Sequence, residues 1–196
     1  MMEKRKDAYY RKARKHGYGS RAAYKLIDID RKFPILFSGM RVLEIGSSPG
    51  GWTDVIMERN PEKLLCVDLT APKGGELPVN IRGDIRNEAT WERIRELSGD
   101  GFDLYLSDAM SHTTGQHDRD HAMSVEICTA VMEHCDPLLL MDGTVVVKQF
   151  QGDMTKEFID RYKGNFKKVY ITKPASSRSE SSEIYIIFSR YRLASQ

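Results

Sequence analysis

The stretch EIGSSPGGWTDVI, residues 44–56, joins a short apolar run to a segment with the pattern of a helix start. Gly46, Gly50 and Gly51 lack the Cβ atoms that would keep a ligand away from the backbone. Backbone N–H groups at the start of a helix can also hold a carboxylate or a phosphate. The turn therefore predicts either a ligand site or a tight strand-to-helix corner. Its spacing, G-x-x-x-G-G, differs from the dinucleotide fingerprint G-x-G-x-x-G.

Outward from this turn, apolar β-rich runs alternate with helical patterns, which is typical of an α/β fold with a mostly parallel sheet. We expect seven strands, at 41–45, 63–69, 79–83, 102–107, 143–150, 167–172 and 182–189. Helical patterns fall at 20–32, 51–59, 88–98, 119–136 and 153–163. The link between the last two strands is too short and polar for a crossover helix, so the final strand should be antiparallel.

Composition predicts one soluble domain, because 196 residues with 40% hydrophobic content can bury a proper core. The sequence has no run of apolar residues long enough for a membrane helix, and the N-terminus is charged where a signal peptide would be apolar. These features predict a cytoplasmic protein. Cys66, Cys128 and Cys135 are odd in number and form no C-x-x-C, so we interpret them as core thiols.

Basic residues concentrate at the N-terminus, where residues 1–25 hold nine Lys or Arg against two acids. Three tyrosines, Tyr9, Tyr10 and Tyr18, are interleaved with them, a pattern that suits phosphate neutralisation with base stacking. The alternative is a solvated charged face. We therefore predict a basic arm over residues 1–19, followed by a single domain over 20–196. The candidate nucleic-acid contacts are Lys4, Arg5, Lys6, Arg11, Lys12, Arg14, Lys15 and Arg21.

Three aspartates come at the ends of successive predicted strands. Asp68 ends the second strand, Asp84 the third and Asp108 the fourth. The carboxyl ends of parallel strands form the ligand edge of such sheets, where an acid can accept ribose hydroxyls. Each aspartate alone is as well explained by a helix cap or a loop. Together with the glycine-rich turn, Asp68 and Asp84 favour an adenosine ligand.

The chain resembles the FtsJ/RrmJ family of RNA ribose 2'-O-methyltransferases, which use S-adenosylmethionine. The resemblance covers nearly the whole chain and is carried, in order, by SRAAYKL, EIGSSPGGWTDV, VDL, GDIRN, LSDAM, VVVKQFQG and KPASSRSESSEIYII. It implies the Rossmann-like methyltransferase fold, with helices on both faces of a seven-stranded sheet whose last strand is antiparallel. It implies catalytic roles for Lys25, Asp108, Lys148 and Glu183. It implies cofactor contacts at Gly46, Ser48, Pro49, Gly51, Trp52, Asp68, Asp84 and Asp108.

The chemistry of ribose methylation explains why such residues are needed. A ribose hydroxyl is hardly ionised at neutral pH, so a base must take its proton, and we expect Lys148 to be that base. A lysine acts as a base only if its pKa falls from ~10.4 through burial or a nearby like charge, which Lys25 can supply. Asp108 and Glu183 would orient the ammonium groups and the hydroxyl. The alternatives are a strand-end lysine that reaches water and a glutamate on an edge strand.

A rival pattern lies in HTTGQHDRDH, residues 112–121, where His117 and His121 have the i, i+4 spacing of a zinc-binding helix. The position that needs a general-base Glu holds Asp118, and the stretch is polar, so we expect no metal. This loop is also where the sequence departs from the family, which often follows its aspartate with Met-Ala-Pro-Asn. Here Ser111 and His112 replace the Pro and Asn, which bears on how the target nucleotide is held.

Three classes of function therefore compete, with RNA methylation ahead. A nicotinamide-dependent oxidoreductase would need the G-x-G-x-x-G turn, and a non-catalytic RNA-binding module would need only the arm. Within the family, the short chain resembles the branch that modifies a uridine of large-subunit ribosomal RNA, free or in the assembling subunit. Methylation of the tRNA anticodon loop is the alternative. We expect a monomer without a membrane partner.

Overall fold

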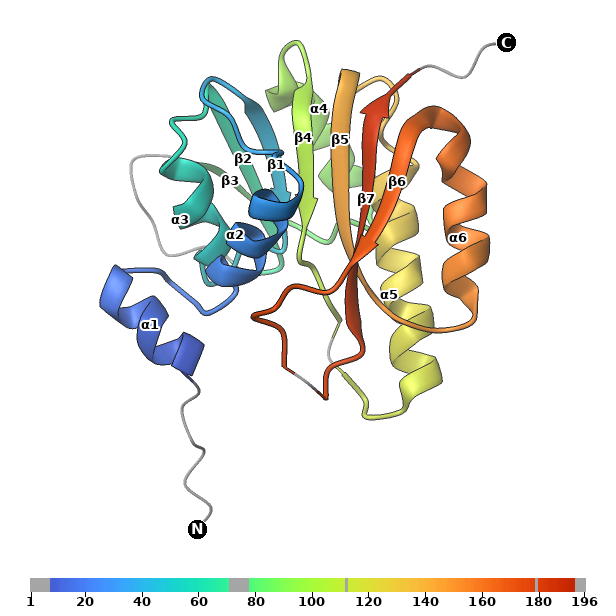
Figure 1. The fold of residues 1–196 in the computed structure, drawn as a ribbon. Helices are drawn as coiled ribbons and strands as arrows, with labels where there is room; N and C mark the ends of the chain where they lie inside the picture. Colours follow the sequence, from blue (N-terminus) through green and yellow to red (C-terminus); the bar gives the residue numbers. More distant parts are fainter. Residues whose placement is uncertain (1–7, 71–77, 112, 179, 193–196) are drawn as a thin grey trace.

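The structure is a computed structural model that describes residues 8–70, 78–111, 113–178 and 180–192. Within these residues, seven strands form one sheet in the spatial order β3-β2-β1-β4-β5-β7-β6 (Figure 1). They are β1 Arg41–Ile45, β2 Lys63–Asp68, β3 Val79–Arg82, β4 Phe102–Ser107, β5 Leu139–Phe150, β6 Phe166–Thr172 and β7 Glu183–Tyr191. Strands β1 to β5 pair in parallel, and β7 is antiparallel to both β5 and β6. The predicted sheet and its antiparallel last strand are confirmed.

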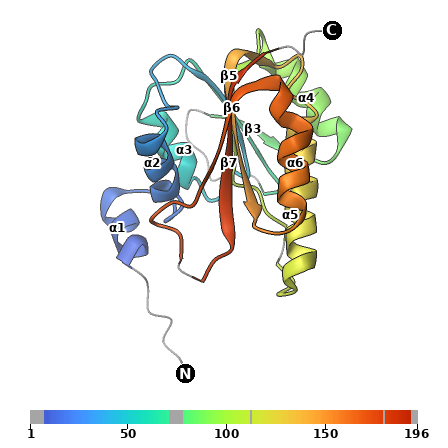
Figure 2. The same cartoon turned by 45° about the vertical axis from the view of Figure 1, so that its right-hand side comes forward.

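Helices cover both faces of the sheet, as predicted. They are α1 Ala8–His16, α2 Ala23–Lys32, α3 Gly51–Met57, α4 Glu88–Ser98, α5 His117–Met132 and α6 Met154–Tyr162, with a short 3₁₀ turn at Lys163–Asn165. Figure 2 shows the sheet nearly edge-on, with α2 and α3 on one side and α4, α5 and α6 on the other. No helix among the described residues is long and apolar enough to cross a membrane.

Two apolar layers hold these helices on the sheet. Leu26 and Trp52 pack on one face, and Trp91 and Phe158 on the other. Side chains of a strand alternate between the faces, so a strand covered on both faces needs a continuous apolar run such as Val145, Val146 and Val147 of β5. All three cysteines are buried free thiols, which confirms their interpretation as core residues.

Several elements differ from the sequence prediction: α2 begins at Ala23, three residues late, and α5 ends at Met132, four residues before the predicted end at 136. Residues 8–16 form α1, inside the predicted arm, and Tyr9 and Tyr18 pack against Tyr24 of α2 with ring centroids 5.5 and 5.8 Å apart. These two rings stabilise the contact between α1 and α2 instead of standing free for base stacking. Strand β5 begins at Leu139, four residues before the predicted start at 143. The sequence Met-Asp-Gly suggests a turn, but here the strand continues through an irregularity in which Asp142 has a φ of +62°.

The topology brings the carboxyl ends of five parallel strands to one edge. The chain order reverses between β1 and β4, which lie side by side in the sheet. The crevice beside such a reversal is where open α/β sheets bind ligands. The glycine-rich turn and all three strand-end aspartates therefore share this edge.

Candidate active site

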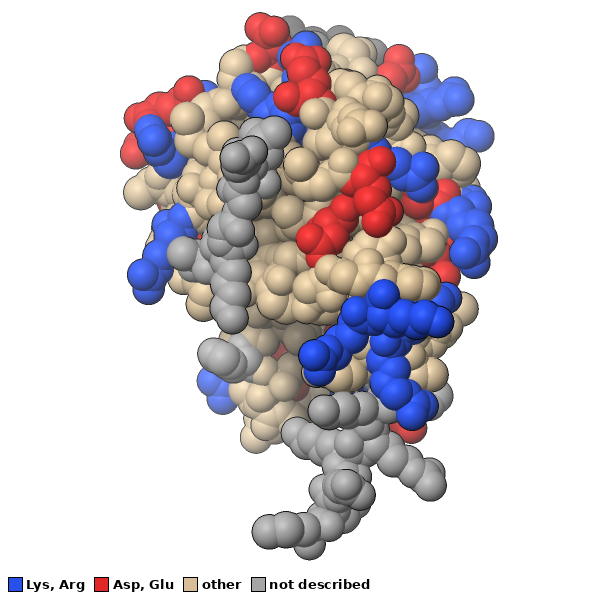
Figure 3. All heavy atoms as spheres, turned by 90° about the vertical axis from the view of Figure 1, so that its left-hand side faces the viewer, with Lys and Arg blue, Asp and Glu red and all other residues tan. Residues whose placement is uncertain are grey.

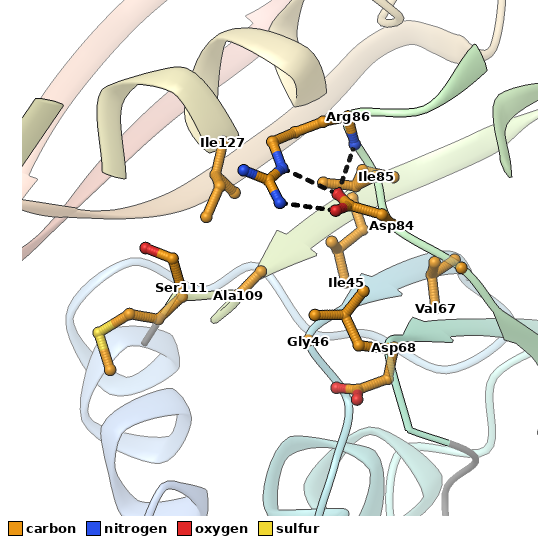
Figure 4. Close-up of a pocket in the computed structure, with 13 residues that line it drawn as sticks. Ile45, Gly46, Val67, Asp68, Asp84, Ile85, Arg86, Ala109, Ser111 and Ile127 are labelled. Carbon is orange, nitrogen blue, oxygen red and sulfur yellow. Dashed lines mark hydrogen bonds and ion pairs between the residues drawn. The ribbon is translucent and has the colours of Figure 1, made fainter. Parts of the chain in front are cut away.

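A pocket opens where β1, β2, β3 and β4 end (Figure 4). Its lining residues are Ile45, Gly46, Val67, Asp68, Leu69, Gly83, Asp84, Ile85, Arg86, Ala109, Met110, Ser111 and Ile127. Gly46 has a φ of +80°, and a Cβ there would lie 2.5 Å from the backbone nitrogen of Ala109. Glycine is required at this position because the turn after β1 approaches the end of β4 so closely.

Asp68 joins the end of β2 to the glycine-rich turn. Its Oδ2 accepts a hydrogen bond from the Ser48 backbone N–H at 3.0 Å. Its Oδ1 accepts from the backbone N–H and the hydroxyl of Thr70, both at 2.8 Å. A carboxylate has about four lone-pair sites, so Asp68 keeps capacity for a ligand hydroxyl at the pocket wall.

Asp84 faces the same pocket and is held by Arg86. The Arg86 Nε and backbone N–H each donate to Oδ1 at 3.0 Å, and Nη2 donates to Oδ2 at 2.6 Å (Figure 4). These hydrogen bonds lower the pKa of Asp84 below its ordinary value, so the carboxylate is an acceptor at neutral pH. Sequence reasoning missed Arg86, although its place two residues after Asp84 permits this local pairing.

The other residues of the glycine-rich turn lie partly at the ligand edge and partly in the core. Ser48 and Pro49 lie in the turn itself, and Ser48 contacts Asp68. Gly51 and Trp52 face α2 and do not line the pocket. The indole of Trp52 is 2% exposed, and its Nε1–H donates to the Ala22 carbonyl oxygen at 2.9 Å. The structure gives Gly51 and Trp52 a packing role, and their cofactor contact stays a prediction.

Beside the pocket, Lys148 and Asp108 form a buried ion pair. The Lys148 Nζ lies 3.0 Å from Asp108 Oδ1 and donates to the Asp108 carbonyl oxygen at 2.6 Å. Lys148 comes from the end of β5 and Asp108 directly follows β4, two strands that are neighbours in the sheet. Only 7% of the lysine side chain is exposed. The fold thus fixes an amine at the ligand edge.

Lys25 and Glu183 form a second pair next to the first. The Lys25 Nζ lies 2.8 Å from Glu183 Oε2, joining α2 to the first residue of β7. Lys148 thus pairs with Asp108, and Glu183 pairs with Lys25. Glu183 pairs with Lys25 because β7 places it opposite Phe150, two residues beyond Lys148.

Tyr185 links the two pairs, and sequence reasoning missed it. Its hydroxyl donates to Asp108 Oδ1 at 2.7 Å, and the Lys25 Nζ lies 5.9 Å from the centre of its ring. Burial raises the pKa of Asp108, but the Lys148 and Lys25 ammonium groups and this hydroxyl outweigh it and lower the pKa. Burial, and then Asp108, raise the pKa of Tyr185 well above its ordinary value. Asp108 is therefore an anion and Tyr185 a neutral donor at neutral pH.

The histidine pattern has a structural explanation. His121 is buried, with Nδ1 2.7 Å from the Phe150 carbonyl oxygen and Nε2 accepting from the Met154 backbone N–H at 3.2 Å. Both ring nitrogens are thus used in holding the segment that follows β5. Among the described residues, no group of three His, Cys, Asp or Glu side chains is arranged to hold a metal ion. His112 lies outside those residues.

The basic residues predicted to bind nucleic acid divide into three groups. Lys4, Arg5 and Lys6 lie outside the described residues. The next group, on α1, is exposed: Arg11, Lys12, Arg14 and Lys15. Figure 3 shows blue side chains gathered on the face that bears α1, with acidic ones above them. Arg21 is half-buried and donates from Nη2 to the Ser176 carbonyl oxygen at 2.6 Å.

This fold and this site define a methyltransferase: residues 18–191 match the family model of the FtsJ-like methyltransferases, and the chain belongs to that family. It is 45% identical over 188 residues to the ribosomal RNA large subunit methyltransferase E of Picrophilus torridus, covering 94% of this chain and 97% of the relative. It is 44% identical over 194 residues to the enzyme of the same name from Thermoplasma acidophilum, covering 96% and 93%.

A solved structure supports the same assignment. A chain from Plasmodium falciparum, described as a ribosomal RNA methyltransferase, superposes with a TM-score of 0.78 at 29% identity. The match covers 89% of this chain and 98% of that one. The predicted family, fold and enzyme class are therefore confirmed: the protein is an RNA methyltransferase.

Proposed function

We propose that this enzyme transfers a methyl group from S-adenosylmethionine to the 2'-hydroxyl of a ribose in large-subunit ribosomal RNA, with a uridine as the target. The observation that carries the proposal is the buried Lys148–Asp108 pair beside the pocket at the carboxyl edge of the sheet. The names of the relatives support ribosomal RNA as the substrate. Methylation of the tRNA anticodon loop is the alternative, and the assay below separates the two.

The pocket residues fit the adenosine part of the cofactor. Asp68 and Asp84 present carboxylate oxygens, which suit ribose hydroxyls and an adenine amino group. Ile45, Val67 and Ile85 supply the apolar walls that a flat base needs. When bound, S-adenosylmethionine supplies an electrophilic methyl group and leaves as S-adenosylhomocysteine. Asp108 would contact it from the end of β4, and the glycine-rich turn would contribute Gly46, Ser48, Pro49, Gly51 and Trp52.

Lys148 would act as the base that removes the proton from the ribose hydroxyl. A neutral lysine amine has two N–H groups and one lone pair. Both N–H groups can keep donating to Asp108, to the carbonyl oxygen and to Oδ1, which leaves the lone pair for the ribose proton. Asp108 then stabilises the ammonium group that forms. General-base help of this kind is worth ~10²- to 10⁴-fold in rate.

Lys25, Glu183 and Tyr185 would hold the reacting groups in place. Lys25 and Glu183 fix each other at 2.8 Å and offer a donor and an acceptor to the ribose. Tyr185 holds Asp108 through a hydroxyl that stays protonated. Correct orientation of reactants contributes ~7 to 11 kcal/mol in well-aligned systems, more than proton removal alone. The cluster thus serves positioning as well as proton transfer.

The remaining parts of the proposal concern the whole molecule. The arm, residues 1–19, would bind the RNA backbone through its basic residues, and residues 20–196 would form the catalytic domain. We propose that the protein acts as a monomer in the cytoplasm on ribosomal RNA or the assembling large subunit. The family assignment favours these roles over hydride transfer and over RNA binding without catalysis.

The deciding experiment measures transfer of tritiated methyl from S-adenosylmethionine to purified large-subunit ribosomal RNA, large subunits and tRNA from cells that lack the gene. We expect label in the ribosomal RNA or the subunits, at one nucleotide that ribose-methylation mapping locates. Label in tRNA alone would replace the ribosomal substrate with the anticodon-loop alternative. No label in any RNA, from folded protein that binds the cofactor, would refute the proposal.

A further inference from the structure

A second hollow lies next to the catalytic cluster, between the start of α2 and the connection from β6 to β7. Its volume is about 510 Å³, within the ~300 to 1,000 Å³ of common ligand sites. Its lining residues are Ser20, Arg21, Ala22, Lys25, Arg178, Glu180, Ser181 and Glu183. Because Lys25 and Glu183 belong to both, a group seated in the hollow adjoins the proposed ribose position.

Two guanidinium groups meet in this hollow from distant parts of the chain. Arg21 precedes α2 and is fixed by its hydrogen bond to the Ser176 carbonyl oxygen. The Ser176 backbone N–H donates in turn to Asp28 Oδ2 at 2.9 Å, so the β6–β7 connection is tied to α2. Arg178 follows two residues later and is exposed. The fold therefore holds Arg178 near Arg21.

The electrostatics of Arg21 indicate that the two cations influence each other. Burial, and then the positive charge of Arg178, lower the pKa of Arg21 below its ordinary value, and the Glu183 carboxylate offsets only part of this shift. Holding two like charges together costs free energy unless an anion lies between them. Guanidinium groups bind phosphate oxygens through paired hydrogen bonds, which makes phosphate the anion that suits this pair best.

We propose that Arg21 and Arg178 bind a phosphodiester that directly adjoins the target ribose, and so set which nucleotide of the RNA enters the active site. This inference rests on the proposed function, because it needs RNA as the substrate. The phosphate would position the backbone over the hollow, with the ribose beside Lys25 and its hydroxyl toward Lys148. The arm on α1 would add contacts farther along the RNA.

Two carboxylates limit how much negative charge the hollow accepts. Glu183 is paired with Lys25, and Glu180 lines the same hollow from the β6–β7 connection. The carboxylate of Glu180 would repel a second phosphate and so restrict the site to one. Glu180→Gln should therefore strengthen RNA binding while it weakens discrimination between RNA positions.

The test combines an enzyme variant with a change in the RNA. The substrate is a synthetic fragment that contains the mapped target, made also with a neutral methylphosphonate linkage 5' or 3' of the target ribose. For the parent enzyme, one of the two neutral linkages should lower kcat/KM roughly tenfold. Arg178→Gln should show a similar loss on unmodified RNA and little further loss on that neutral RNA. Its cofactor affinity should not change.

Arg93→Gln is the matched control, because Arg93 is exposed on α4, across the sheet from α2. It should behave like the parent with every RNA. If each neutral linkage lowers kcat/KM by the same factor for the parent and for Arg178→Gln, the proposal is wrong. Arg178 is exposed, so this variant should fold even if Arg21→Gln does not.

The result stays distinct from failure of the proposed function. If the parent methylates no RNA and no target is mapped, fluorescence anisotropy measures the phosphate site with a short single-stranded RNA fragment, made also with neutral methylphosphonate linkages throughout. Arg178→Gln should then bind the unmodified fragment more weakly than Arg93→Gln does and bind the neutral fragment equally. If Arg178→Gln binds the unmodified fragment as tightly as Arg93→Gln does, Arg178 does not bind a phosphate and the proposal is wrong.

Discussion

The lysines at the edge of the sheet and the basic residues of α1 carry the same charge in opposite surroundings. Lys148 and Lys25 expose 7% and 12% of their side chains, and each has a carboxylate within 3.0 Å. Arg11, Lys12, Arg14 and Lys15 are exposed on α1. A buried charge needs a fixed partner, whereas an exposed charge is solvated and screened. The first group is therefore suited to act on one atom, and the second to attract a polyanion.

Two carboxylates show how strongly the neighbouring groups determine the pKa of an acid that is shielded from water. Glu44 is buried and Asp108 largely buried near the ends of neighbouring strands, yet their pKa values move in opposite directions. Asp108 has Lys148 and Lys25 nearby, which lower its pKa despite burial. Glu44 accepts hydrogen bonds from the Thr53 hydroxyl and the Cys66 thiol, at 2.7 and 3.2 Å. These donors are too weak to offset burial, which raises the pKa of Glu44 to about 7.

The largest effect we predict is the loss of methyl transfer in Lys148→Arg and Lys148→Ala. Losing a general base should lower the single-turnover rate at least ~10²-fold. Arginine keeps the charge beside Asp108 but cannot release its proton at a usable pH, so it should fail as well. The parent rate should rise with pH through one ionisation that is absent in both variants.

Lys168→Ala, which removes an exposed lysine of β6, is the control and should keep the parental rate. Lys148→Ala leaves Asp108 without its nearest cation, so the melting temperature and cofactor binding must be measured for each variant. A folded Lys148→Arg enzyme with a near-parental rate would make Lys148 an electrostatic clamp. The base proposal would then be wrong.

The strand and helix order was predictable because local patterns encode it. Every predicted strand exists, since buried parallel strands require the apolar runs that were found. α1 was missed because four of its nine residues are Lys or Arg, and its packing depends on Tyr24 of another helix. The early start of β5 was missed because Asp142 and Gly143 favour a turn unless neighbouring strands hold them.

The sequence allowed a prediction of which residues form the site, but not of which of them contact each other. The family resemblance gave Lys25, Asp108, Lys148 and Glu183, but only the fold shows that Glu183 pairs with Lys25. Tyr185 looks like a core residue in an apolar strand, and no local pattern shows that its hydroxyl reaches Asp108. The proximity of Arg178 to Arg21 likewise appears only in the fold, where the β6–β7 connection lies beside α2.

A second prediction separates the two buried carboxylates by the pH dependence of stability. A carboxyl group with a raised folded-state pKa favours folding when protonated. Its contribution is therefore lost as the pH rises from the ordinary value of 4.5 to about 7. The loss amounts to roughly 3 kcal/mol at 1.36 kcal/mol per pKa unit. Glu44→Gln, which is always neutral, should remove this fall in the free energy of unfolding.

Urea denaturation of both proteins at pH 5, 6, 7 and 8 provides the measurement. The free energy of unfolding of Glu44→Gln should rise relative to that of the parent steadily up to pH 7 and change little above it. Glu96→Gln, at an exposed position on α4, should follow the parent throughout. A difference between Glu44→Gln and the parent that does not vary with pH would mean that Glu44 does not titrate in this range.

The smallest effect per residue is expected on α1, where Arg11→Gln, Arg14→Gln and Lys15→Gln are combined. Deleting residues 1–19 would be a poor test, because the Gly19 backbone N–H donates to Asp54 of α3 at 2.6 Å. Glutamine preserves helix formation and removes only the charge. Each lost phosphate contact lowers the slope of log affinity against log salt by ~0.7 to 0.9, so the total should fall by about 2 to 3.

Substituting Arg93, Lys156 and Arg161 by Gln removes the same charge from α4 and α6, across the sheet from α2, and should leave the slope nearly intact. An equal change in both triple variants would show that the RNA senses only the net charge of the protein, and the arm would then be no RNA-binding surface.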